Sequence, residues 1–218
     1  MGTQERKERD KKRRRDQILN AAIELIGEQG FESTTMDEIA ERAELSKGTL
    51  YLYFNDKATL HHAIKKRALS YLHESFLKVI QEDLTGAELV KKMMLTFLSL
   101  ITENPTFTKA MMLFEHSNEN DTESHQVEED CSHLESEILM LIIRSIQIGK
   151  QDGSILSTIN PKVSAVMIGF QMSGMLQFYI SGSRKQAQKI LDEHQLSMFE
   201  IMDQFLDIQF SSTQDLAS

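Results

Sequence analysis

Apolar residues recur at every third or fourth position along most of this chain, which is the spacing of amphipathic α-helices. The first such run is expected to end near Gln29, where Gly30 can cap the helix. Only two prolines and ten glycines occur in 218 residues, so long helices are expected. The pattern predicts an all-α fold of about nine helices. The longer ones are expected near residues 57–82, 86–103, 105–116, 133–150, 161–181 and 187–210.

Two short helices are expected near residues 36–43 and 47–53. Thr34-Thr35 supplies an N-cap for the first, and Ser46 supplies one for the second after a turn of about three residues. Two short helices joined so tightly follow the helix-turn-helix plan, in which the second helix lies in the major groove of DNA.

The outer face of the second short helix suits the approach to phosphates. No charged residue lies between Lys47 and Asp56, although most amphipathic surface helices carry several outward charges. At about 100° per residue, Leu50 falls on the inner apolar face, whereas Gly48 and Leu52 fall on the outer face.

Residues 16–60 resemble the DNA-binding domain of the TetR (tetracycline-repressor-like) regulators. The motifs that carry the resemblance are Gly30-Phe31, Thr34-Thr35, Ile39-Ala40, SKGTLY at 46–51, Tyr53-Phe54 and Lys57. The rest of the chain agrees with that family only in length and helical pattern. The resemblance implies a helix-turn-helix DNA-binding domain at 13–56 and a helical effector-binding and dimerisation domain at 57–218. Residues 1–12 are polar and are expected to form a disordered basic arm.

The resemblance also implies which residues contact DNA: Thr35, Ser46, Lys47, Gly48, Thr49, Tyr51, Leu52, Tyr53 and Lys57. Thr35 and Ser46 are expected to bind phosphates at helix N-termini, where free N–H groups favour anions. Leu52 is expected to press on a thymine methyl group. For Tyr53, core packing against Phe54 is an equally open interpretation.

The charge is unevenly distributed along the chain. The net charge is −9. Residues 1–67 hold 14 basic and 12 acidic side chains, a net +2, and the remaining 10 and 21 give −11. Only the N-terminal part is therefore expected to meet DNA. Residues 1–15, with eight basic and three acidic side chains, are either an arm that contacts phosphates or the minor groove, or a solvated charge run.

The second domain is rich in methionine and phenylalanine. These side chains could line a deformable apolar pocket for a small hydrophobic effector, since methionine adapts to varied ligands. Ordinary core packing is the other interpretation. The pocket candidates are Met93, Met94, Phe97, Met111, Met112, Phe114, Glu115, His116, Phe170, Met175 and Phe178.

The helix expected near 161–181 is uncharged over 21 residues, from 163 to 183. That length would allow a membrane span, but Gln171 and several serines argue against one and no membrane contact is expected. A helix that is apolar nearly all round must be buried, and a second copy of the chain could bury it. The expected homodimer interface comprises Gly169, Ser173, Gly174, Met198, Met202 and Phe205. Such a dimer would bind a palindromic operator in double-stranded DNA.

No enzymatic motif is found in the sequence. A Gly-rich phosphate loop, G-x-S-x-G and H-E-x-x-H are all missing. His61-His62 and the group of His125, Cys131 and His133 do not match a closed metal site, so neither a metal nor a cofactor is expected. A single cysteine and no visible signal peptide fit the cytoplasm.

The sequence thus predicts a transcriptional regulator, specifically a repressor that a hydrophobic ligand releases from its operator. One alternative is a helical protein that binds a hydrophobic ligand or a partner protein and has little affinity for DNA. A membrane-attached protein that uses the helix near 161–181 is a third possibility, and it predicts that the purified chain needs detergent.

Overall fold

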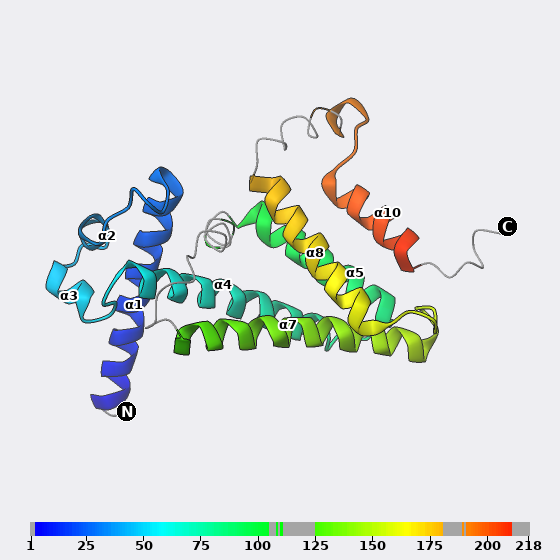
Figure 1. Cartoon of the computed structure of the whole chain (residues 1–218), viewed down its shortest axis with the longest axis horizontal. Helices are drawn as coiled ribbons and strands as arrows, with labels where there is room; N and C mark the ends of the chain where they lie inside the picture. Colours follow the sequence, from blue (N-terminus) through cyan, green and yellow to red (C-terminus); the bar gives the residue numbers. More distant parts are fainter. Residues whose placement is uncertain are drawn as a thin grey trace. The chain divides into compact units, whose positions relative to one another are not determined.

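The computed structural model describes residues 3–104, 108, 110, 125–180, 189 and 191–210. Every regular element in this part of the chain is a helix, which confirms the predicted all-α fold (Figure 1). The helices are α1 (Thr3–Gln29), α2 (Met36–Arg42), α3 (Lys47–Tyr51), α4 (Lys57–Val79), α5 (Gly86–Glu103), α7 (His125–Asp152), α8 (Pro161–Ile180) and α10 (Met198–Phe210).

The chain forms two compact units. Unit 1 contains Met1–Ala68 and Pro105–Ser132, and unit 2 contains Leu69–Asn104 and His133–Ser218. The division therefore falls inside α4 rather than at the predicted boundary between residues 56 and 57. The reason is that the first turns of α4 belong to the core of the helix-turn-helix.

Contacts from α4 to the segment before α2 illustrate this. Leu60 and Ile64 on α4 are fully buried. The Lys57 ammonium donates to the Glu32 carbonyl at 3.2 Å, and the His61 ring lies 4.9 Å from that of Phe31.

The helix α1 is the central element of unit 1. Its inner face buries Ile18, Ala22 and Ile26 against α2 and the residues around α3. The prediction that residues 1–12 are disordered is wrong for residues 3–12, which form the first turns of α1. Glutamate, lysine and arginine are good helix formers, so a composition typical of disorder also suits a solvated helix. Arg13 and Asp10, three residues apart, form an ion pair at 3.5 Å on its surface.

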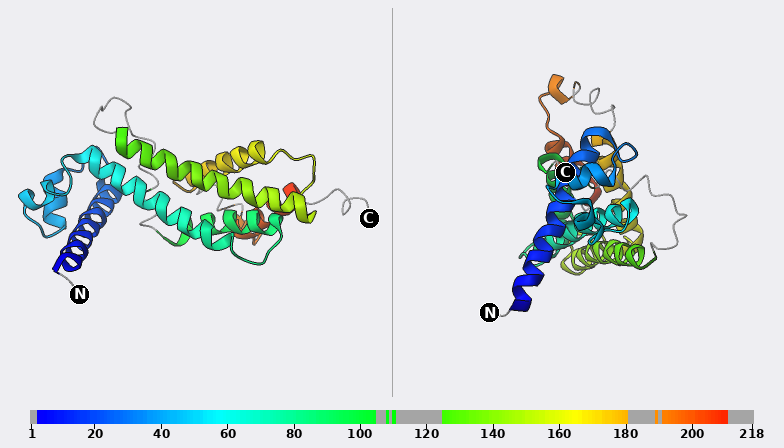
Figure 2. Two further views of the ribbon diagram at one scale, coloured as in Figure 1. Left: turned by 90° about the horizontal axis from the view of Figure 1, so that it is seen from below. Right: turned by 90° about the vertical axis from the view of Figure 1, so that its left-hand side faces the viewer.

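In unit 2, α5 packs against α8 and α10. Its inner face buries Met93, Met94 and Phe97. The last turns of α4 and the neighbouring part of α7 lie side by side in both directions of view (Figures 1 and 2), and the His73 ring nitrogen of α4 is 3.9 Å from the Glu137 carboxylate of α7. No helix among the described residues, α8 included, has the length and apolar character needed to cross a bilayer.

A close crossing fixes the start of α5 against the end of α7. A Cβ atom added to Gly86 would lie 1.9 Å from the backbone nitrogen of Gly149, so only glycine fits there. The Gly86 N–H donates to the Asp152 carboxylate at 2.8 Å, and the Ala87 N–H donates to the Ser154 hydroxyl at 3.1 Å. Residues from the end of α7 therefore cap α5, because the first N–H groups of a helix have no partner within it.

The pKa of Asp152 reflects this role. Burial acts to raise it, but hydrogen bonds from the Ser154 hydroxyl and from the backbone N–H groups of Gly86 and Ser154 outweigh burial and hold the pKa below its ordinary value. A lowered carboxyl pKa in the folded state means that the ionised form stabilises the fold. This stabilisation is complete above the unfolded-state pKa of about 3.9 and is lost as the pH falls through the folded-state pKa.

We expect Asp152→Ala to lower the free energy of unfolding by about 1–2 kcal/mol at pH 7, because the Gly86 N–H at the start of α5 and the Ser154 N–H lose an ionised acceptor. Urea unfolding at pH 7 and at several pH values below 4 would measure the effect. The difference from the original chain should shrink at the lower pH values, where Asp152 itself becomes protonated. Asp83→Ala, which removes an exposed carboxylate from the loop before α5, is the control, and an equal loss in both variants would contradict the capping role.

Candidate nucleic-acid interface

The first helix of the helix-turn-helix, α2, begins with a reciprocal cap. The Glu38 N–H donates to the Thr35 hydroxyl oxygen at 3.2 Å, while the Thr35 N–H and hydroxyl both donate to the Glu38 carboxylate at 2.8 Å. Hydrogen bonds from the Thr35 hydroxyl, the Thr35 N–H and the Gln29 amide hold the pKa of Glu38 below its ordinary value. Thr35 is thus a helix cap whose donors are already engaged, and the expected phosphate contact requires exchanging Glu38 for a phosphate.

One left-handed residue and two hydrogen bonds define the conformation of the turn between α2 and α3. Glu44 adopts a left-handed conformation with φ of 54°, which a residue other than glycine seldom does. The Leu45 N–H donates to the Ala40 carbonyl at 2.9 Å, and the Gln17 amide of α1 donates to the Ala43 carbonyl at 2.7 Å. These contacts fix the direction in which the chain enters α3.

The second helix, α3, ends at Tyr51 and is shorter than the predicted 47–53. Ser46 caps it, since its hydroxyl oxygen accepts the Thr49 N–H at 3.2 Å and lies 2.8 Å from the Thr49 hydroxyl. Leu50 and Phe54 are fully buried and hold α3 to the core of unit 1. The two hydroxyl-bearing residues at its start are therefore engaged with each other in the free chain.

The outer face of α3 is open to solvent. Leu52 is 83% exposed and Tyr51 is 47% exposed, which is unusual for large apolar side chains. Gly48 is exposed as well, and no atom would lie within 4 Å of a Cβ added to it. Tyr53 is half-buried beside Phe54, so both of its predicted roles stay open. The structure thus groups Gly48, Tyr51 and Leu52 on one accessible surface, as the helical wheel predicts.

Every basic side chain in residues 34–57 has an acceptor within the chain. The Lys47 ammonium lies 2.5 Å from an Asp37 carboxylate oxygen. Arg42 donates two hydrogen bonds to Glu28, at 3.0 and 2.8 Å, and Lys57 donates to the Glu32 carbonyl and lies 4.2 Å above the Phe31 ring. Lys47 and Lys57, which are expected to contact DNA, therefore already have acceptors in the free chain.

The pairing of Lys47 with Asp37 is a feature that sequence reasoning missed. The helical wheel of α3 considers only residues on that helix, whereas Asp37 lies on α2, ten residues earlier. A signal was present in the sequence, because a turn of only about three residues keeps the two short helices within reach of a long lysine side chain. An acidic residue two positions after the α2 cap could have been considered as a partner for Lys47.

Residues 34–57 contain three basic and five acidic side chains, a net charge of −2. The positive charge of unit 1 is instead concentrated at the start of α1, where residues 3–15 hold eight basic and three acidic side chains. Arg15 connects this segment to the helix-turn-helix, since its guanidinium lies 4.9 Å from the centre of the Phe54 ring. We call the accessible surface formed by Gly48, Tyr51 and Leu52 the reading surface. The positive charge of unit 1 therefore lies on a different helix from the reading surface.

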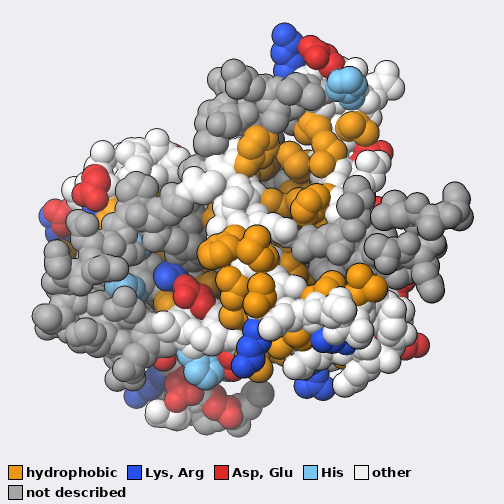
Figure 3. All heavy atoms as spheres, turned by 45° about the vertical axis from the view of Figure 1, so that its right-hand side comes forward, with side chains coloured by type: hydrophobic (Ala, Val, Ile, Leu, Met, Phe, Trp, Pro, Cys, Tyr) orange, Lys and Arg blue, Asp and Glu red, His pale blue; other side chains and the backbone are white. Residues whose placement is uncertain are grey.

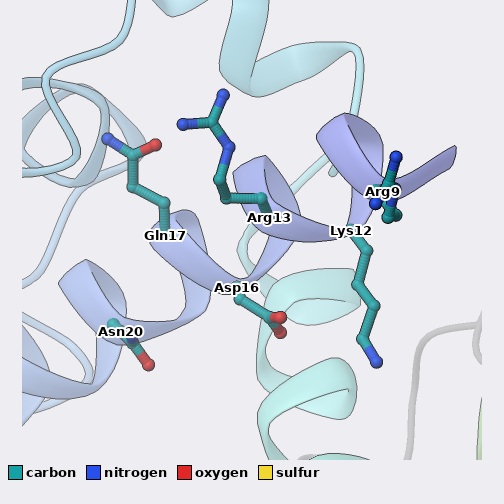
Figure 4. A pocket seen from close by; sticks show the side chains of 6 residues that line it. All are labelled: Arg9, Lys12, Arg13, Asp16, Gln17 and Asn20. Carbon is teal, nitrogen blue, oxygen red and sulfur yellow. The ribbon is translucent and has the colours of Figure 1, made fainter. Parts of the chain in front are cut away.

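A shallow hollow runs along the exposed face of α1 and is lined by Arg9, Lys12, Arg13, Asp16, Gln17 and Asn20. Its side chains do not converge, because Arg13 and Gln17 point to one side of the helix and Asp16 and Asn20 to the other (Figure 4). Asn20 also accepts a hydrogen bond from Arg67 at 2.7 Å. The hollow is therefore part of a charged helix surface rather than a closed anion site.

Within the described ranges, no group of three or more His, Cys, Asp or Glu side chains has the geometry to hold a metal ion. His61 is buried beside Phe31, and Cys131 is also buried. The side chain of His125 lies outside the described residues.

The predicted pocket residues fall into three groups. Met93, Met94 and Phe97 are buried along α5, and Met175 and Phe178 of α8 are half-buried. Phe170 is 67% exposed, so its prediction as a pocket residue is wrong, because α8 turns this side chain outward. The others lie outside the described residues, namely Met111, Met112, Phe114, Glu115 and His116.

The predicted dimer residues lie partly on an open surface of unit 2. Ser173 and Gly174 are exposed, Gly169, Met198 and Met202 are half-buried, and Phe205 is 44% exposed. We define the α8 stripe as the exposed apolar residues Val163, Val166, Met167 and Phe170. Apolar side chains gather at the molecular surface in Figure 3. Sequence reasoning selected the small residues of α8 and missed the large ones beside them.

The chain was compared with known proteins. Residues 18–64 match the family model described as "Bacterial regulatory proteins, tetR family". A fatty acid metabolism regulator protein of Bacillus subtilis (strain 168) is 33% identical over 72 residues, which is 33% of this chain and only 37% of that relative. An uncharacterized HTH-type transcriptional regulator of the same organism, YhgD, is 27% identical over 168 residues, covering 77% of this chain and 81% of that relative.

Among solved structures, that of AibR in complex with isovaleryl coenzyme A and operator DNA is similar in fold. The TM-score is 0.65 at 21% sequence identity, over 90% of this chain and 98% of that chain. The likeness extends well beyond residues 18–64, so the helices of unit 2 follow a known arrangement too.

We expect Leu52→Ala to change which DNA sequence is bound best, with a difference of ~1–3 kcal/mol at the affected base pair. The reason is that Leu52 is the most exposed apolar side chain of α3 and can touch only what docks there. Selection of bound fragments from a random DNA library would compare the variant with the original chain. Tyr71→Ala, which removes a large side chain that is 48% exposed on α4, is the control. Identical preferred sequences for Leu52→Ala and the original chain would contradict the role.

Proposed function

We propose that this chain, which belongs to the TetR family of bacterial regulatory proteins, is a sequence-specific DNA-binding transcriptional regulator. In this proposal it is a repressor that a small hydrophobic ligand releases from a palindromic operator. The single observation that carries the proposal is the outer face of α3, which exposes Gly48, Tyr51 and Leu52 while Leu50 and Phe54 anchor the helix from behind. Leu52, a large exposed apolar side chain that directly follows the fixed five-residue helix α3, suits contact with base edges.

The start of α1 supplies positive charge for the phosphates in this proposal. Affinity for the DNA backbone depends on lysine and arginine side chains that displace counterions, and residues 34–57 carry a net charge of −2. Lys7, Lys11 and Arg14 continue the inner face of α1 that begins at Ile18, because they precede it by 11, 7 and 4 residues. This inner face is the side on which the helix-turn-helix packs, so these three side chains are placed best for the same DNA.

We further propose that the chain is a homodimer through the α8 stripe. Four large apolar side chains exposed together on one helix are costly in water, and a second copy of the chain can cover them. A two-fold axis through this surface would pair two α3 helices for two half-sites.

The proposed effector binds in the interior of unit 2. Buried methionine and phenylalanine side chains of α5 can rearrange around an apolar ligand. AibR, which is similar in fold, was solved with isovaleryl coenzyme A, so an acyl thioester is the first class of ligand to test. Because α4 contributes residues to both units, a ligand that alters its packing in unit 2 could shift the population of states with α3 placed for DNA.

The function is tested by fluorescence anisotropy with DNA from upstream of the gene and with random DNA, at several salt concentrations. We expect salt-dependent binding with a preference of ~10³ or more for the operator. Isovaleryl coenzyme A should weaken operator binding, whereas coenzyme A alone should not. If the chain bound neither that DNA nor any fragment of a genomic library with a preference, the regulator would be disproved in favour of a hydrophobic-ligand or partner-binding protein.

Replacing Lys7, Lys11 and Arg14 together by glutamine is expected to flatten the salt dependence of DNA binding. The slope of log K against log salt should fall by about 0.9 for each phosphate that the variant no longer neutralises. The preferred DNA sequence should not change, because α3 is untouched. Anisotropy titrations with operator and random DNA provide both measurements.

The matched control replaces Arg6, Arg9 and Arg13 by glutamine, which removes the same charge from the same helical turns. These side chains continue the opposite, exposed face of α1. Equal slopes for the two triple variants would show that the inner face of α1 has no special position relative to DNA.

Phe170→Glu is expected to convert the dimer into a monomer, because a buried carboxylate without a partner opposes association. Sedimentation equilibrium measures the change in mass. Met140→Glu, at another exposed apolar position of unit 2 on α7, is the control and should leave the dimer intact. Dimers in both variants would exclude the α8 stripe as the interface.

A further inference from the structure

We propose that Asp37 competes with DNA phosphates for Lys47 and thereby limits the affinity of the chain for any DNA. This inference rests on the proposed function and concerns the regulation of the same site. The Asp37 carboxylate lies beside the start of α3, where a negative charge is unfavourable for DNA binding.

The geometry places Asp37 directly on Lys47. One carboxylate oxygen of Asp37 lies 2.5 Å from the Lys47 ammonium, and the two side chains are 54% and 66% exposed. The pair joins the first turn of α2 to the first residue of α3. Lys47 is therefore held at the start of α3, which is the recognition helix in the proposed function because it would lie in the major groove.

Asp37 is not needed to begin either helix. Thr35 and Glu38 form the cap of α2, and Ser46 forms the cap of α3 with the Thr49 N–H. The Asp37 side chain is 54% exposed. Its contributions to the fold are a carboxylate near a helix N-terminus and an exposed ion pair, and both effects are weak and screened at solvated positions.

Binding of DNA must break this pair. A phosphate that reaches Lys47 exchanges one anion for another, so fewer counterions are released than if the lysine were free. The carboxylate left behind then stands near the phosphate and repels it. Both effects are electrostatic and do not depend on the base sequence, so Asp37 lowers affinity for operator and random DNA by a similar factor.

The other cations of residues 34–57 do not share this arrangement. Arg42 binds Glu28 on α1, away from the start of α3. Lys57 donates to a backbone carbonyl of Glu32 rather than to a carboxylate. In this segment, Lys47 alone combines a position at the start of the recognition helix with a carboxylate partner that is itself exposed.

Asp37→Asn tests the inference, since asparagine keeps the shape of the side chain and removes its charge. Anisotropy titrations with operator and random DNA should show about 3- to 10-fold tighter binding to both at ~0.1 M salt. The slope of log K against log salt should become steeper by about 0.9 for each protomer bound. Thermal unfolding should be nearly unchanged.

Glu41→Gln is the matched control. Glu41 is an exposed carboxylate one turn later on the same helix, and it is not the carboxylate that pairs with Lys47, so this variant makes the same change in net charge without breaking that ion pair. The inference expects a smaller gain in affinity than for Asp37→Asn. Equal gains would overturn it, because the effect would then follow from net charge alone.

A double-mutant cycle with Lys47→Gln shows whether Asp37 acts through Lys47. In the Lys47→Gln background, Asp37→Asn should improve binding clearly less than it does in the original chain. An undiminished gain would overturn the competition. Failure of the original chain to bind any DNA would instead disprove the proposed function, so the two failures are distinguishable.

Discussion

The reading surface depends on the burial of Leu50 and Phe54 in the core of unit 1. A helix of five residues is too short to be stable alone, because its nucleation cost exceeds what one or two hydrogen bonds return. Both side chains are fully buried, and each contributes roughly 1.5–3 kcal/mol relative to exposure in water. Tertiary packing thus supplies the stability of α3. The identities of its outward-facing residues can therefore be determined by contact with DNA rather than by the fold.

Electrostatic attraction and sequence reading are separated in unit 1. The helix α1 carries the excess of positive charge, whereas α3 presents an apolar and small-residue surface with its one lysine held by Asp37. Exposed ion pairs are worth only about 0.2–1 kcal/mol, so such pairs are strong enough to tune the approach to DNA and weak enough to be exchanged during binding. The Arg15 guanidinium lies over the Phe54 ring and so connects α1 with the segment that follows α3.

The sequence was sufficient to predict the all-α class, both caps of the helix-turn-helix and the residues exposed on α3. These features are local, since they depend on residues three or four positions apart. Three features were missed or misjudged. The start of α1 has a composition shared by disorder and helix, the partner of Lys47 lies on another helix, and the outward direction of Phe170 depends on which side of an almost uniformly apolar helix faces α5. Each of these depends on contacts between elements, which periodicity alone does not specify.

The 83% exposure of Leu52 has a consequence for how this chain can evolve. A side chain with almost no contacts inside the protein can be replaced without a loss of packing. Gly48, where an added Cβ meets no neighbour, has the same freedom. Gene duplicates could therefore diverge toward new operators by single substitutions at these two positions, whereas substitution of the buried Leu50 or Phe54 would destabilise the helix that presents them.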